Sequence, residues 1–333
     1  MRMDYKKANV AFFFMVLSTF VIMVYISFWQ AFTGRALSLP ANNALCELMI
    51  LIPAVSVIMY SGEGMWSVIP FKKVKIGSAI LSVLYVITLF PLVAFVNAIS
   101  MLFVDNAVAS VSNQIIEHPV VLMLASIGLF GPFVEEIVFR GVIYQSYRRT
   151  GRILASMILS AVLFGMMHLN FNQFEYGAVM GFMFCLMVEA TGSVLPSFIA
   201  HAVFNSIEVV SIYVGSGTAE EIEDSEGVMS QFFPNMSEGV YLVILLCVLC
   251  VAAVISTAIA IIIVNKMAAI EGRKSYLDNL KFRKKNQDPN VMNVAGEVKV
   301  AEKKQSLFTA PLVIVMILAI CFMLYSAVAL QGV

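Results

Sequence analysis

Long apolar runs, each able to cross a lipid bilayer, are the feature that most constrains the fold of this chain. A membrane-spanning helix needs about 20 mostly apolar residues, and the 333-residue sequence contains nine candidate runs. Their approximate ranges are 9–32, 43–61, 76–104, 119–147, 152–169, 173–191, 193–214, 239–265 and 307–329. We therefore predict an all-α fold, a polytopic transmembrane helical bundle of about nine spans.

The composition excludes a soluble domain. Hydrophobic residues make up 60% of the chain and charged residues only 13%, whereas a soluble domain carries about 25% charged residues. Soluble folding cannot hide that much apolar surface. We expect the lipid bilayer as a partner and no nucleic acid.

Lysine and arginine predict the orientation, because loops that carry them tend to stay inside. With the N-terminus inside, nineteen of the 21 basic residues fall in inside loops. The two exceptions are Arg35, in an outside loop, and Arg140, within a span. We therefore predict an integral, multi-pass membrane protein with its N-terminus inside and its C-terminus outside.

These spans divide the chain into four parts. Residues 1–118 carry about three N-terminal spans, and residues 119–214 carry about four spans that hold most of the unusual polar residues. An acidic outside loop follows at 215–238. Residues 239–333 carry the C-terminal transmembrane helices, joined by a basic inside loop at 266–306.

The run 119–147 contains three charges, Glu135, Glu136 and Arg140. A charge at the bilayer centre costs about 2.5–3.5 kcal/mol on insertion scales, so these residues call for an explanation. Glu136 and Arg140 are four apart, share one helix face and are predicted to form an ion pair. Glu135 faces a different direction and is available for another task.

Two of the three histidines, His168 and His201, also lie within predicted spans. His201 and Asn205 are four apart and point the same way along a helix. Glu135 is 13 residues from Arg148, about 20 Å along a helix, and His168, His201 and Asn205 lie at roughly similar depths. Three successive spans are therefore expected to bring these four side chains to one buried point, helped by the close helix approach that the Gly177–Gly181 spacing allows.

The segments EEIVFR, FGMMH and HAVFN have the forms EExxxR, FxxxH and HxxxN. In this order on successive membrane segments, they resemble the CPBP family of intramembrane proteases. That family includes the type II CAAX prenyl endopeptidases and the bacteriocin-processing and self-immunity proteins. The resemblance covers about residues 119–214.

The resemblance implies a glutamate-dependent endopeptidase without a cofactor. By motif position, Glu135 would be the general base, His168 would bind or polarise the water, and His201 and Asn205 would form the oxyanion hole. Glu136 and Arg140 would hold the base in place. A peptide or protein substrate is implied, and it is hydrophobic, membrane-associated or prenylated.

Three alternatives stay open at this level. Two histidines and a glutamate are adequate ligands for catalytic zinc, although they would come from three helices and no HExxH occurs. Intramembrane ionisable residues also mark transport pathways, and a non-catalytic scaffold could carry the same motifs. Of the other span carboxylates, Glu208 is a candidate to line the same cavity, and Glu189 is expected at the membrane interface.

Overall fold

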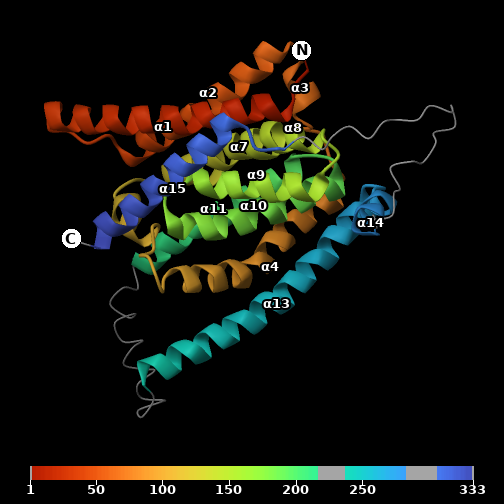
Figure 1. Cartoon of the computed structure of the whole chain (residues 1–333). Helices are drawn as coiled ribbons and strands as arrows, with labels where there is room; N and C mark the ends of the chain where they lie inside the picture. The colour runs from red at the N-terminus through yellow and green to blue at the C-terminus, as the bar shows by residue number, and fades with distance from the viewer. Residues whose placement is uncertain (1, 217–236, 283–305, 332–333) are drawn as a thin grey trace.

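The computed structural model describes residues 2–216, 237–282 and 306–331, and within these ranges it contains helices and no strand (Figure 1). The long helices are α1 (Tyr5–Thr33), α2 (Leu39–Ser61), α4 (Ile76–Ser100), α9 (Ile153–Met167), α10 (Phe171–Thr191), α11 (Leu195–Ser216), α13 (Glu238–Ile270) and α15 (Ala310–Gln331). Shorter elements are α3 (Met65–Val68), η1 (Ala109–Val111), α5 (Ser112–Ile116) and α14 (Lys274–Phe282). The predicted all-α polytopic bundle is confirmed.

Eight helices in the described ranges are long and apolar enough to cross a membrane. The remaining predicted span, 152–169, is α9, an apolar helix of 15 residues, about 22 Å long. The other predicted spans each coincide with one of the eight. Most of the predicted acidic loop 215–238 and much of the basic loop 266–306 lie outside the described residues.

The helix that carries the charged motif is continuous from Val120 to Arg148 but not uniform. Its segments are α6 (Val120–Met123), the π-helical η2 (Leu124–Phe130), α7 (Gly131–Glu136), the π-helical η3 (Ile137–Ile143) and α8 (Tyr144–Arg148). Pro132 lies inside this continuous helix, directly after η2, and has no backbone N–H to donate within it. Single π turns often mark functional sites because they rotate the side chains that follow.

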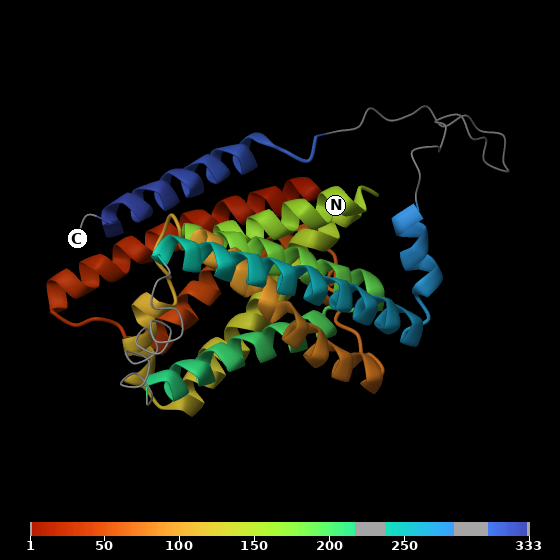
Figure 2. The ribbon, with the colours of Figure 1, turned by 90° about the horizontal axis from the view of Figure 1, so that it is seen from below.

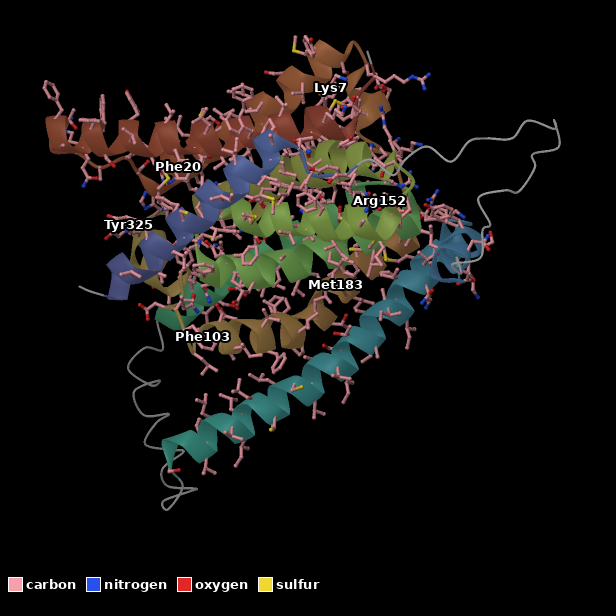
Figure 3. The ribbon with its side chains drawn as sticks, in the orientation of Figure 1. Lys7, Phe20, Phe103, Arg152, Met183 and Tyr325 are labelled. Carbon is pink, nitrogen blue, oxygen red and sulfur yellow. The ribbon has the colours of Figure 1, made fainter. Side chains whose placement is uncertain are left out.

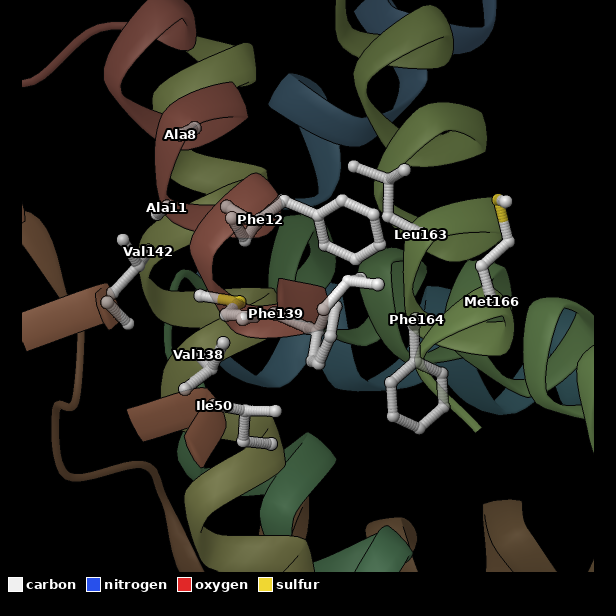
Figure 4. Close-up of a cluster of buried hydrophobic side chains, with 14 of the residues drawn as sticks. Ala8, Ala11, Phe12, Ile50, Val138, Phe139, Val142, Leu163, Phe164 and Met166 are labelled. Atoms are coloured by element: carbon white, nitrogen blue, oxygen red, sulfur yellow. The ribbon is translucent and has the colours of Figure 1, made fainter. Parts of the chain in front are cut away.

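Two groups of buried apolar side chains hold the bundle together. The first gathers residues of α1, α2, α7, η3, α9 and α15, and Figure 4 shows part of it around Phe12, Phe139 and Leu163. The second gathers residues of α4, α10, α11, α13 and α14. Helix α15 lies beside α1 in both ribbon views (Figure 1, Figure 2). The charged helix packs into the first group and reaches α11 of the second, so its motif lies at the seam between them.

Basic residues gather at one end of the bundle. Figure 3 labels Lys7 and Arg152 at that end, and Phe103 and Tyr325 at the other. Several contacts tie the helix ends there, such as Arg149 Nη1 to Glu63 Oε1 at 2.7 Å and Lys75 Nζ to the Ile270 carbonyl at 2.6 Å. The separation of charge expected from the loop residues is thus matched by the spatial arrangement.

Helices α9 and α10 approach closely through glycine, as the Gly177–Gly181 spacing predicts. A Cβ added at Gly181 would lie 3.0 Å from the Ala161 Cα, and one at Gly165 would lie 2.4 Å from the Phe174 carbonyl oxygen. Real Cβ atoms do not tolerate the second of these distances. This approach brings His168, at the end of α9, to the face of α10 and α11.

Candidate active site

The adjacent glutamates of the charged helix have different environments. The Glu135 side chain is 17% exposed and lines a cavity of about 1190 Å³, whereas the Glu136 side chain is fully buried. Neighbouring residues on a helix point in directions about 100° apart. Glu135 therefore faces the cavity while Glu136 is buried in an ion pair, as the helical spacing predicts.

Glu136 pairs with Arg140, as the spacing predicts. Arg140 Nη1 lies 2.8 Å from Glu136 Oε1, and neither side chain is more than 1% exposed. The guanidinium also lies over two aromatic rings, 4.1 Å from the Phe164 centroid and 5.1 Å from that of Phe184. A cation held over aromatic faces is stabilised without water, so Arg140 is anchored from α9 and α10 as well as from its own helix.

His201 of α11 joins the two glutamates. Its Nδ1 lies 3.0 Å from Glu136 Oε1, and its Nε2 lies 3.4 Å from Glu135 Oε2. A ring held by a carboxylate at each nitrogen has a fixed orientation. The Glu136–Arg140 pair therefore positions His201, and His201 in turn presents Nε2 to the carboxylate that faces the cavity.

His168 and Asn205 complete the set. His168 is the C-cap of α9, and its ring makes an edge contact with Phe164 at 5.3 Å between centroids. Asn205 Nδ2 donates to the Ile127 carbonyl oxygen, at 3.2 Å, in the π-helical segment η2. An amide nitrogen carries two hydrogens, so one N–H remains for the cavity. Glu135, His168, His201 and Asn205 all line the same cavity.

The cavity extends from these residues toward the end of the bundle opposite the basic residues. Its lining there includes Asn97 near the end of α4, Asn106 in the following loop and Ser326 near the end of α15. Figure 3 labels Phe103 and Tyr325, neighbours in sequence of those residues, at that end. Its lining mixes apolar side chains with many polar ones, including several asparagines, so it can contact both the side chains and the backbone of a peptide.

Sequence reasoning missed two residues that line or support this site, Glu47 and Phe184. Glu47 of α2 is 7% exposed and lines the cavity, and its position within an apolar span was a usable signal. Phe184 of α10 packs against the Arg140 guanidinium, and no local sequence pattern predicts this contact. Glu208, weighed from its spacing to His201, does line the cavity. Glu189 was expected at the interface but is buried, because other groups at the basic end cover it.

A metal ion at this site would need several side chains grouped as its ligands. Among the residues that the structure describes, no three His, Cys, Asp or Glu side chains are grouped so as to hold a metal ion. The Nδ1 of His201 faces Glu136, the kind of carboxylate contact that the outer nitrogen of a metal-bound histidine also makes, and its Nε2 lies beside Glu135. The choice between glutamate and zinc chemistry therefore rests on experiment.

Comparison with known proteins supports the resemblance based on the motifs. Residues 117–207 match the family model described as type II CAAX prenyl endopeptidase Rce1-like, and this range contains all three motifs. A stretch of 90 residues is 31% identical to the Bacillus subtilis protein named "Putative membrane peptidase YdiL". That alignment covers 27% of this chain and 36% of the relative, so it spans little more than a third of that protein. No solved structure matches. The resemblance to the CPBP family is confirmed over the segment that carries the motifs.

Proposed function

We propose that this multi-pass membrane protein is an intramembrane endopeptidase that uses a glutamate-activated water. The observation that carries the proposal is the convergence of Glu135, His168, His201 and Asn205, from three parts of the chain, on one cavity within the bundle. The match of residues 117–207 to a peptidase family supports the same reaction class.

In the proposed reaction, Glu135 accepts a proton from a water molecule held beside His168, and the water oxygen attacks the scissile carbonyl carbon. A base within hydrogen-bond reach is the first requirement for this step. Negative charge then develops on the carbonyl oxygen. The His201 ring and the second N–H of Asn205 face the same cavity and are the groups available to stabilise that charge.

In this proposal, Glu136 and Arg140 act by holding His201 in position. Glu136 accepts from His201 and is itself paired with Arg140. Since Arg140 is held between two aromatic rings from other helices, the orientation of His201 depends on packing across the seam of the bundle. A site held by a second layer of contacts keeps its geometry through the reaction.

We propose that the substrate is a peptide segment that is hydrophobic, lipidated or membrane-associated. The apolar part of the cavity lining favours such a chain, and the volume of about 1190 Å³ is large enough to admit several residues. A prenylated C-terminus is one form of such a substrate. The peptide bond would lie beside Glu135, with its flanking apolar residues along the lining of α4, α10 and α11.

We also propose that the basic end of the bundle faces the cytoplasm, because basic residues are retained on that side. The cavity then opens toward the opposite face. Reporter tags inserted at Gly151 in the basic end and at Asp105 in the loop after α4 test the orientation. We expect the tag at Gly151 inside and the tag at Asp105 outside; a shared compartment, or the reverse, would contradict it.

The function is tested by cleavage of a defined set of quenched fluorescent hydrophobic peptides, with and without a prenyl group. We expect purified full-length protein to cleave at least one peptide after treatment with a chelator. Glu135→Gln removes the base while keeping shape, so turnover should fall by about 10²–10⁴-fold with an unchanged unfolding temperature.

Elemental analysis of the chelator-treated, active protein separates glutamate from zinc chemistry. Loss of one oxyanion donor should lower turnover by about 10²–10³-fold, so Asn205→Ala should be severely impaired in a glutamate enzyme. A zinc enzyme would instead lose metal and activity together, in His168→Ala and His201→Ala as well as with the chelator. Binding of peptides without cleavage by folded wild-type protein would favour a scaffold.

A further inference from the structure

Glu47 is a buried carboxyl group that the motif residues do not include. It belongs to α2, far outside the segment 117–207 that matches the peptidase family. Its side chain is 7% exposed and lines the same cavity as Glu135. A carboxylate within a membrane span is costly and marks a functional site by default, so its presence calls for a reason.

The Glu47 carboxyl lies beside Gly131, which is one helical turn before Glu135. Its Oε1 would be 3.2 Å from a Cβ added at Gly131, so the glycine leaves the space that this carboxyl occupies. Gly131 and Glu135 are four residues apart on α7, and residues with that spacing are neighbours on one helix face, about 5–6 Å apart. The absence of a side chain at Gly131 thus leaves room for a second carboxyl on the face of α7 that carries the proposed base.

No basic group explains Glu47 as a structural ion pair. Its Oε2 is buried and has no hydrogen-bond partner within the described residues. The nearest amide on its own helix face, Asn43, is turned to Ser126, with Nδ2 3.1 Å from the serine Oγ. The cavity lining in the described part of the chain contains carboxylates of Glu47, Glu135 and Glu208 but no lysine or arginine.

We propose that Glu47 and Glu135 form a carboxyl pair that shares one proton, with Glu47 as the acid that protonates the leaving amine. This rests on the proposed peptidase function. Two neighbouring carboxyl groups repel each other when both are ionised, so one keeps a proton while the other is free to act as a base. The pair therefore supplies a base and an acid at once.

The proton balance of the reaction then closes. Glu135 takes a proton from water as the C–O bond forms, and the carbonyl oxygen becomes an oxyanion. As the C–N bond breaks, Glu47 gives its proton to the amine nitrogen and the oxyanion returns to a carbonyl. Glu135 passes the proton it holds to Glu47, which restores the starting state with one carboxylic acid and one amine as products.

The pH dependence of this pair involves the other titratable groups that line the cavity. These are Cys46 on α2 itself, His168 at the end of α9, Tyr176 on α10, and His201 and Glu208 on α11. The experiment therefore compares pH profiles of matched variants. Glu47→Gln keeps the shape of the side chain but cannot donate an acidic proton.

The test measures turnover against pH for full-length wild type, Glu47→Gln and Glu47→Asp on the quenched fluorescent peptides described above. We expect Glu47→Gln to lower turnover by about 10²-fold or more and to abolish the decline on the alkaline side that loss of the acid produces in wild type. Glu47→Asp should restore part of the turnover. Wild-type cleavage that is lost in Glu135→Gln establishes the peptidase function separately.

A second measurement does not depend on cleavage. Infrared spectra of wild type at neutral pH should contain the carbonyl stretch of a protonated carboxylic acid, which Glu47→Gln should remove and the buried control Glu189→Gln should retain. Gly131→Ala should lower turnover because the added Cβ, 3.2 Å from Glu47 Oε1, shifts that carboxyl by a few tenths of an ångström, whereas Gly64→Ala, with its nearest contact at 3.8 Å, should not. Turnover close to wild type in folded Glu47→Gln, or persistence of the infrared band in that variant, would overturn the proposal.

Discussion

Two of the glutamate–arginine pairs among the described residues, one at the cavity and one at the basic end, are built differently. At the cavity, Glu136 and Arg140 are one turn apart on a single helix, and both are at most 1% exposed. At the basic end, Glu189 of α10 meets Arg148 of α8 across helices, with the Arg148 side chain 33% exposed. The first pair lies beside the candidate site, and the second joins α8 to α10 at the basic end of the bundle.

The N···O distances of the two pairs are similar, 2.8 Å and 2.5 Å, but their other hydrogen bonds differ. Glu189 accepts from Tyr144 at 2.7 Å, Arg148 at 2.5 Å and Tyr276 at 2.5 Å, so both of its oxygens are occupied. At the cavity, Glu136 Oε2 and Arg140 Nη2 have no hydrogen-bond partner within the described residues, and Arg140 Nη1 has only its 2.8 Å ion-pair contact with Glu136 Oε1. In the pair at the basic end, both carboxylate oxygens of Glu189 are hydrogen-bonded, and the pair joins α8 to α10. The cavity pair is instead supported by two aromatic rings and by His201. A change to this pair should therefore affect the orientation of His201 as well as the stability of the protein.

The largest effect that sharpens this comparison should come from Glu136→Gln. Loss of one charge leaves Arg140 buried without its partner, and breaking a buried ion pair costs about 3–5 kcal/mol. His201 also loses its anchor, so turnover should fall together with the free energy of unfolding. Thermal unfolding and peptide cleavage, measured on the same preparation, check both outcomes.

A smaller effect is expected from the matched change Glu189→Gln at the basic end. Hydrogen bonds to a charged group contribute about 1.5–3 kcal/mol, and the partly exposed Arg148 can turn to solvent when its partner is lost. Stability should fall, while turnover of the remaining folded protein should match wild type. The comparison breaks down if Glu189→Gln lowers turnover and Glu136→Gln does not.

The smallest expected effect concerns Glu63, also at the basic end. A hydrogen bond from Arg149, reinforced by the Met3 backbone N–H, lowers the pKa of Glu63 from 4.5 to about 2. A lowered folded-state pKa stabilises the protein above pH 4.5, and this contribution disappears as the pH falls through about 2. For so exposed a pair it should be at most about 1 kcal/mol.

Unfolding temperature against pH, compared between wild type and Glu63→Gln, measures this contribution. The two proteins should differ at neutral pH and converge as the pH approaches 2. A difference that grows on acidification would mean that Glu63 does not act through its charge.

Local sequence patterns predicted the parts of this protein that depend on near neighbours. The length of the apolar runs predicted the spans, because one bilayer thickness sets one helix length. The four-residue spacing predicted the Glu136–Arg140 pair, which the structure contains. The motif order also predicted which helices meet, and the four expected side chains do line one cavity. Their catalytic roles stay predictions until activity is measured.

Only the tertiary structure decided which distant side chains complete each cluster. Glu47 meets the site because α2 packs on α7 where Gly131 has no side chain. Glu189 is buried because Arg148 and Tyr276 from other helices close over it. Helical periodicity determines which residues share a face, but the partner of that face depends on packing between segments far apart in the chain. That is the physical reason why the sequence determined the spans and the motif faces of this protein, whereas the second carboxyl of the cavity could be recognised only in the folded bundle.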